Sequence, residues 1–273
     1  MLMGLFSLFG RKKEHQQTLD LRTVTDDPVE AASLAGDGLF IIDVPVEKIR
    51  VLDFWGADPD NPFVATLREY AEGRCGRYKG SPLESFYRCW QPFAPGQPKE
   101  EEDCGPPWRT VRPKAQNTAT GRLQRHEFRE IARDLGFASD EIVGHIKGGP
   151  VSEAFGEITF RRLARLYDSI SRDGFRPESS LARYPTGFCF VRDGDYRVSI
   201  GSGKHRVLVM LALGWPKIPL ELGPPKLPVI TQRKEVDQWP NVANGRYTRD
   251  QALRRFDDIF RQRHPSGWQK GRG

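Results

Sequence analysis

One short segment, GSGKHR at residues 201–206, combines the residue types that bind phosphate groups. It follows a predicted strand over 196–200 and opens a predicted helix over 204–213, so the first amides of that helix lack partners within it. Those amides and the positive end of the helix dipole favour an anion. The glycines allow close approach, the serine offers a hydroxyl, and the lysine and arginine add charge. We therefore predict a phosphate site at Gly201, Ser202, Gly203, Lys204, His205 and Arg206.

The segment differs from the two commonest phosphate loops. It has neither the GxxxxGK[ST] pattern of a Walker A loop nor the GxGxxG fingerprint of a dinucleotide-binding domain. The structural alternative is a glycine-capped helix whose lysine and arginine are ordinary surface residues. From Val207 to Leu213 the residues are apolar around the whole helix, which predicts that this helix is buried.

The order of elements around this segment resembles the ParB/sulfiredoxin superfamily. The resemblance runs through residues 166–177, 188–200, 201–214 and 215–222, and residues 44–50 resemble the strand and turn that open that domain. Relatives in the superfamily hold nucleotide phosphates at the position of Gly203, Lys204, His205 and Arg206. The resemblance therefore implies a nucleotide di- or triphosphate as ligand, with or without Mg²⁺. The serine kinases of the superfamily add phosphoryl transfer or hydrolysis as an expectation.

Two departures from the family pattern limit this expectation. Lys204 stands where sulfiredoxins carry their catalytic cysteine, which excludes reduction of sulfinic acids through that thiol. Residues 51–160 form a long insertion after the first strand, and no helix-turn-helix pattern follows Leu222, so a role in chromosome segregation is not supported. Residues 81–92, 148–153 and 238–248 resemble a bacterial subgroup with a ParB-like core, which adds no activity.

Two further groups of residues are candidates for ligand contacts. The side chains that could stack on a base or hydrogen-bond a sugar are Tyr87, Arg88 and Trp90. Packing of these aromatic rings in the core is the alternative. Backbone amides that could form a second phosphate nest belong to Gly148, Gly149 and the nearby Ser152. An ordinary loop explains the same residues.

Candidates for catalysis are few. The acidic residues expected near the phosphate site are Glu153, Glu157, Asp193 and Asp195. A carboxylate there could bind a metal or accept a proton from a hydroxyl group. Turn formation explains the pair around Gly194, and the dipole of a helix start explains Glu157.

The remaining pattern predicts an α+β protein, and the resemblance implies that its core is a ParB/sulfiredoxin-like mixed sheet. Strands are expected over 39–44, 187–192, 196–200 and 217–222, with a hairpin turn at Asp193-Gly194. Helices are expected to begin at Asn61-Pro62 and Ser81-Pro82, and to cover 122–135, 160–173 and 204–213. The predicted parts are a loosely ordered polar segment (1–36), the core (37–54 and 155–223), a mainly helical insertion (55–154) and a C-terminal extension (224–273) with one helix.

The charge is unevenly distributed along the chain. The sequence holds 42 Lys and Arg against 36 Asp and Glu, and the whole excess lies in residues 226–273, with 11 basic and 5 acidic side chains. A capping box at Thr248 and Gln251 opens an amphipathic helix there. It is either docked with a solvated basic face or a binding surface for nucleic acid or an anionic membrane. The alternatives to nucleotide binding are thus a nucleic-acid-binding module, or a regulatory or scaffold protein with a vestigial phosphate site.

The composition limits the class of protein and the compartment that we expect. Hydrophobic residues make up 38% of the 273 residues, and no apolar run reaches the ~20 residues that span a bilayer, so we expect a soluble, cytoplasmic protein. The four cysteines form no CxxC pair and no zinc-ligand spacing, which favours reduced, packed thiols and no metal site. The apolar residues 1–9 precede Arg11-Lys12-Lys13, unlike a signal peptide. They form a frayed terminus or a short amphipathic element.

Overall fold

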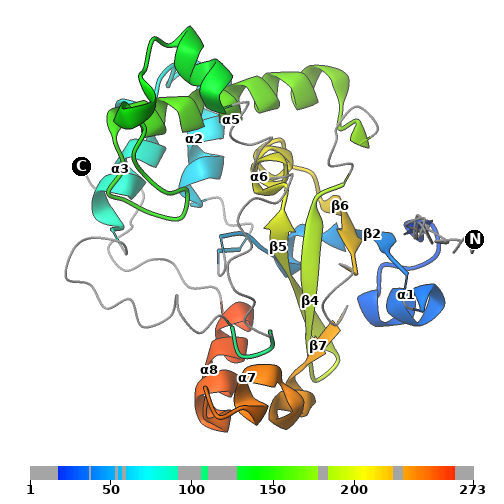
Figure 1. The fold of residues 1–273 in the computed structure, drawn as a ribbon. Coiled ribbons are helices and arrows are strands. Elements are labelled where there is room, and N and C mark those ends of the chain that lie inside the picture. Colours follow the sequence, from blue (N-terminus) through cyan, green and yellow to red (C-terminus); the bar gives the residue numbers. More distant parts are fainter. Residues whose placement is uncertain are drawn as a thin grey trace, which may run out of the picture.

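A mixed seven-stranded sheet organises the protein (Figure 1). The computed structural model describes residues 18–36, 38–52, 55–56, 60–91, 106–109, 128–177, 184–223 and 230–261. The strands are β1 (Leu19–Asp20), β2 (Phe40–Pro45), β3 (Ile49–Arg50), β4 (Thr186–Arg192), β5 (Asp195–Ser202), β6 (Lys217–Leu222) and β7 (Ile230–Gln232). Their order is β1-β2-β6-β4-β5-β3, and β7 pairs with β4 beyond the end of the β4–β6 ladder.

Both parallel and antiparallel pairs occur in this sheet. β2 runs antiparallel to β6, and β4 and β5 form the predicted hairpin. The hairpin turn places Asp193 at φ 51° and Gly194 at φ 78°, the two positive φ values of a type I′ turn. β1 with β2, β3 with β5, and β4 with both β6 and β7 are parallel. The combination of this mixed sheet with separate helices is consistent with the expected α+β class.

Helices cover one face of the sheet and share its main core. They are α2 (Pro62–Ala71), α3 (Pro82–Cys89), α5 (Glu153–Asp173) and α6 (Lys204–Ala212). A further helix over 128–134 packs on α5 in a small separate cluster. α6 contacts both α2 and α5, and α5 runs across the top of the view in Figure 1. The predicted helix starts are confirmed, since the side chains of Asn61 and Ser81 accept hydrogen bonds from the first turns of α2 and α3. The predicted burial of α6 is also confirmed, because Val207 to Met210 are fully buried.

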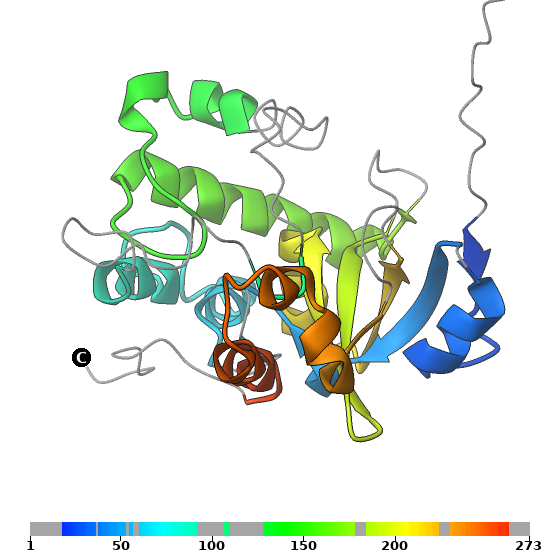
Figure 2. The same ribbon diagram turned by 60° about the horizontal axis from the view of Figure 1, so that its bottom comes forward.

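The C-terminal extension packs on the other face of the sheet. It consists of β7, a 3₁₀ helix (Arg233–Gln238), α7 (Pro240–Ala243) and α8 (Arg249–Phe260), and α7 and α8 lie close together in Figure 2. The side chains of Phe188 and Phe190 pack against residues of the 3₁₀ helix, α7 and α8. Alternate residues of β4 point to opposite faces, so Cys189 joins the main core while Phe190 joins this second cluster. The predicted capping box of Thr248 and Gln251 is present.

Several elements differ from the sequence prediction. The expectation of a loosely ordered segment is wrong for residues 18–36, which form β1 at the sheet edge and α1 (Pro28–Ala35). Asp27 caps α1, and Ala31 is fully buried. α5 begins at Glu153 and not at residue 160, and the C-terminal extension holds α7 and a 3₁₀ helix besides α8. Short 3₁₀ turns occupy Val46–Lys48 and Ser139–Glu141.

The insertion is not a separate unit in the described part of the chain. Phe63 of α2 and Phe86 of α3 belong to the same buried cluster as Val198 of β5. Among the described residues, no helix is long and apolar enough to cross a membrane. The predictions for residues 1–13 and 122–127 lie outside the described residues.

Candidate functional site

The start of α6 has the geometry expected of an anion site. β5 ends at Ser202 and α6 begins at Lys204, with Gly203 between them at φ 74°. No side chain caps this helix start, and the first helical hydrogen bond runs from the amide of Val207 to the carbonyl of Gly203 at 3.1 Å. The amides of the three preceding residues therefore lie ahead of the intrahelical ladder.

Gly203 is required where it stands. Its positive φ strains any residue with a side chain. A Cβ atom at this position would also lie 2.9 Å from Nη2 of Arg206 and 2.9 Å from Cβ of Pro185. The backbone of the turn is thus in close contact with the Arg206 guanidinium, which is held at the first turn of α6.

Positive charge accumulates around this helix start. Arg206 is half-buried, with its guanidinium carbon 5.8 Å from the ring centre of Phe175. Burial, followed by the charge of Arg162 on α5, lowers the pKa of Arg206. Burial, followed by the charges of Arg162 and Lys204, holds the pKa of His205 well below its ordinary value. The neighbouring charges thus add to the effect of burial on both groups, and a bound anion would offset these charges.

His205 adds a buried polar atom to the site. Its side chain is only 7% exposed, and its Nε2 has no hydrogen-bond partner in the described structure. A buried ring nitrogen without a partner is costly, and a ligand oxygen is one way of supplying that partner.

The sequence predicted Ser202 as a site residue but did not predict Arg162. Ser202 shares a hydrogen bond of 3.0 Å with Thr186 across the hairpin, so its hydroxyl is already oriented. Arg162 escaped prediction because helical periodicity alone does not show which element its face of α5 meets. It lies on α5, which packs against α6, and its charge adds to the effect of burial in lowering the pKa values of His205 and Arg206.

The second predicted phosphate nest does not form. The amide of Gly149 donates to the carbonyl of Trp90 at 2.6 Å, that of Ser152 to Val143 at 2.7 Å, and that of Gly148 to His145 at 3.4 Å. The Ser152 hydroxyl caps α5 by accepting from the amide of Phe155 at 3.1 Å. These donors are used within the protein, so the ordinary-loop interpretation describes them.

The predicted base- or sugar-binding residues divide between core and surface. Tyr87 is buried, donates its hydroxyl hydrogen to the carbonyl of Ile146 at 3.2 Å, and packs edge-on against Phe63. This is the core-packing alternative. Arg88 is exposed and Trp90 is half-buried. Tyr87, Arg88 and Glu153 line a cleft of about 350 Å³ to which residues 201–206 do not contribute.

Two acidic candidates have other partners. Glu157 accepts a hydrogen bond from the amide of Tyr78 at 2.9 Å and pairs with Arg161 at 3.1 Å. Asp195 bonds Lys48 at 2.5 Å and Arg197 at 2.7 Å. Partial burial raises the pKa of Asp195, but these two cations outweigh it and lower the value to about 2.

The position of Asp195 separates it from the phosphate site. It begins β5, whereas α6 follows the other end of that strand. At a rise of ~3.3 Å per residue, seven steps along the strand place it roughly 23 Å away. Asp193 lies still further, in the hairpin turn, where its positive φ accounts for it.

The basic C-terminal helix is docked through arginines of the sheet. The buried guanidinium of Arg50 donates from Nε to the carbonyl of Ile259 at 2.7 Å. Asp257 of α8 accepts from Arg192 at 3.1 Å and from Arg233 at 2.9 Å. Residues 230–261 hold seven basic and five acidic side chains, so only +2 of the +6 excess lies in this docked part. The rest falls outside the described residues.

Comparisons with other proteins add no assignment. No family model, no curated protein and no solved structure matches this chain. Within the described ranges, no group of three or more His, Cys, Asp or Glu side chains could hold a metal ion. The candidate site therefore rests on the residues of this chain.

Proposed function

We propose that the protein binds a nucleotide di- or triphosphate through its phosphates at the start of α6. The observation that carries the proposal is the helix start behind Gly203, which no side chain caps and which lies among the cations Lys204, Arg206 and Arg162. The resemblance to the ParB/sulfiredoxin superfamily supports it, because the motif of that family occupies the same strand–turn–helix. The proposal includes that fold assignment.

Each residue has a distinct part in this proposal. The amides at the start of α6 donate to phosphate oxygens, and the helix dipole adds a favourable field. Arg206 offers two parallel hydrogen bonds to the phosphate oxygens. Lys204 adds a compact positive charge, and Arg162 adds a second planar guanidinium with paired N–H donors. Neutral His205, protonated on Nε2, donates one further hydrogen bond. Mg²⁺, where it takes part, arrives with the triphosphate.

The proposal assigns binding and no catalytic residue. Asp195 and Asp193 belong to the far end of the hairpin, and Glu157 is held by Tyr78 and Arg161. Phosphoryl transfer or hydrolysis would need an acceptor or a base from elsewhere. Binding without turnover is therefore the expected outcome with nucleotide alone.

Calorimetric titration of the full chain with ATP, ADP, CTP and GTP, with and without Mg²⁺, tests the proposal. We expect a Kd below 1 mM for at least one nucleotide and a loss of tenfold or more in Arg206→Ala. Lys204→Gln removes a charge at a half-buried position with little change of side-chain volume and should also weaken binding. Arg254→Ala, on the exposed side of α8, is the matched control and should bind normally.

Two results would overturn the proposal. One is the absence of any binding below 1 mM in a chain that is folded by circular dichroism, which favours the scaffold alternative. The other is unchanged binding in both Arg206→Ala and Lys204→Gln. If the chain instead binds RNA or DNA with a steep salt dependence that truncation after Leu222 removes, the nucleic-acid alternative replaces it.

A further inference from the structure

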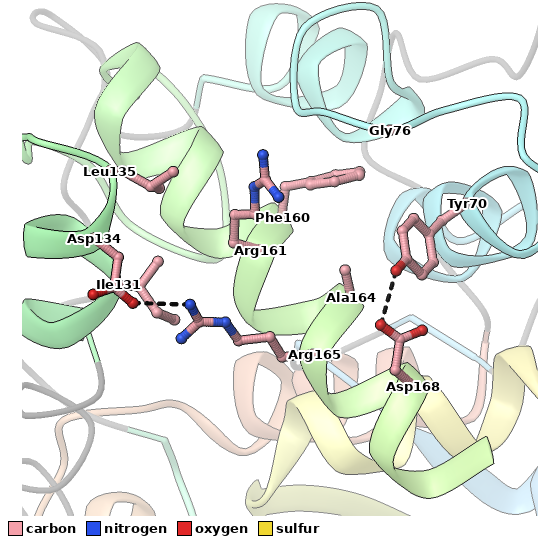
Figure 3. A pocket seen from close by; sticks show the side chains of 10 residues that line it. All are labelled: Tyr70, Gly76, Ile131, Asp134, Leu135, Phe160, Arg161, Ala164, Arg165 and Asp168. Carbon is pink, nitrogen blue, oxygen red and sulfur yellow. Dashed lines mark hydrogen bonds and ion pairs between the residues drawn. The ribbon is translucent and has the colours of Figure 1, made fainter. Parts of the chain in front are cut away.

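A cleft of about 310 Å³ lies between α5, the helix over 128–134 and the C-terminal end of α2 (Figure 3). Its apolar lining includes Phe160 and Ala164 of α5 together with Ile131 and Leu135 of the neighbouring helical segment. Ligand pockets usually span ~300–1,000 Å³, so the cleft has room for one small molecule. It is separate from the residues assigned above to phosphate binding.

Two arginines of α5 stand at this cleft on successive turns. Arg161 and Arg165 are four residues apart, which corresponds to a rise of about 6 Å. Arg161 uses Nε for Glu157 at 3.1 Å, and Arg165 uses one Nη atom for Asp134 at 2.9 Å. Each guanidinium therefore keeps further N–H donors that are engaged by no other described residue.

The acidic groups at the cleft set a limit on the charge of a ligand. Asp134 is paired with Arg165, and Asp168 accepts a hydrogen bond of 2.8 Å from the hydroxyl of Tyr70. Burial and the neighbouring Asp168 raise the pKa of Tyr70, so this hydroxyl stays a donor to the carboxylate at neutral pH. One anionic group finds donors on these arginines, while a second would meet the carboxylates.

We propose that this cleft binds a small monocarboxylic acid with an aromatic or branched apolar body. The carboxylate accepts hydrogen bonds from Arg161 and Arg165, and the apolar body packs on the partly exposed side chains of Tyr70 and Leu135. Charge-assisted bonds to the carboxylate supply specificity, and the burial of apolar area supplies affinity. This proposal stands independently of nucleotide binding at α6.

Gly76 provides a way to block the cleft without disturbing the fold. It lines the cleft, and a Cβ atom added there meets no heavy atom within 4 Å. Its φ lies outside the left-handed region, so a larger side chain is tolerated by the backbone. Gly76→Phe should therefore occupy the cleft, and Gly76→Ala should leave it open.

The test compares indole-3-acetate with its neutral isostere indole-3-acetamide, titrated into the full chain and followed by calorimetry and ligand-observed NMR. We expect the acid to bind at least tenfold more tightly than the amide. Arg161→Gln and Arg165→Gln should each weaken the acid fivefold or more and leave the amide unchanged. Gly76→Phe should abolish binding of both probes. Arg172→Gln, an exposed change on the same helix, is the matched control and should bind as the wild type.

Three results would overturn the inference. These are equal affinity for the acid and the amide, no binding of the acid by the folded wild-type chain, and unchanged binding in Gly76→Phe. A nucleotide titration of Gly76→Phe separates this site from the α6 site, because that variant should bind nucleotide normally whether or not the cleft is a ligand site.

Discussion

Arg50 is expected to hold α8 on the sheet, and replacing it with methionine should release that helix. The Arg50 side chain is 2% exposed, yet it carries a charge. It donates to the carbonyls of Ile259 at 2.7 Å, Ile49 at 2.8 Å and Glu47 at 3.0 Å, and more weakly to that of Phe260 at 3.5 Å. Two of these carbonyls end α8, where the helix dipole is negative and the last carbonyls lack helical partners.

The size of the effect follows from the bonds that reach α8. Burial, with a smaller contribution from Arg197, lowers the pKa of Arg50 to about 10, so the guanidinium stays charged at neutral pH. Of its four acceptors, only the carbonyls of Ile259 and Phe260 belong to α8. A hydrogen bond from a charged donor contributes ~1.5–3 kcal/mol, and the bond to Phe260 is long, so Arg50→Met should destabilise the docked state of α8 by about 3 kcal/mol.

Hydrogen exchange measures this change directly. A loss of about 3 kcal/mol corresponds to roughly 100-fold faster exchange at amides of α8, such as Arg261, which donates to the carbonyl of Asp257. Arg254→Met, on the exposed side of the same helix, should leave exchange unchanged. Less than threefold acceleration in Arg50→Met, or equal acceleration in both variants, would refute the reasoning that Arg50 holds α8.

Three further changes test the charges and the backbone. Asp195→Asn should make the free energy of unfolding fall less steeply between about pH 4 and pH 2. The folded pKa of Asp195 lies below its unfolded value, so its contribution to stability is present above pH 4 and is lost on acidification. After allowance for the 38% exposure of its side chain, this contribution is about 1 kcal/mol. The wild type should lose stability below about pH 6.5, because a His with a lowered folded pKa binds its proton preferentially in the unfolded chain. His205→Leu should remove this loss. If urea titrations show the same dependence of the free energy of unfolding on pH in both proteins, the buried neutral imidazole is contradicted. Gly203→Ala should lower the free energy of unfolding by about 1–3 kcal/mol, since it combines a positive φ with a close contact to Arg206, and equal stability would show that the turn relaxes freely.

Local signals predicted much of the fold. The Asp193-Gly194 turn, the Asn61 cap and the Thr248 capping box act over two to four residues, and each appears as predicted. The start of α5 was predicted too late because Gly156 is a poor residue for a helix interior. The reason for it is tertiary: a Cβ atom at 156 would lie 2.3 Å from the ring of Tyr78, so only glycine lets the two segments approach.

α1 shows a different limit of sequence reasoning. Asp27-Pro28 carries the same start signal as Asn61-Pro62, but three of the seven residues that follow in α1 are alanine, and the apolar pattern is weak. The roles of Arg162 at the candidate site and of Arg50 beneath α8 could likewise not be predicted from the sequence. Both depend on contacts between elements far apart in the chain, which no local spacing encodes.

The pairing of β2 with β6 has a consequence for how the chain folds. Phe40 lies opposite Leu222, about 180 residues away in sequence. Closing so long a loop is entropically costly, so α2 and α3, whose contacts are local, should form well before the sheet is complete. A chain still being synthesised holds the apolar side chains of Ile42 and Val44, both fully buried in the finished protein, beside an unpaired strand edge. That interval is when aggregation or chaperone binding should occur, and it ends only when β6 has left the ribosome.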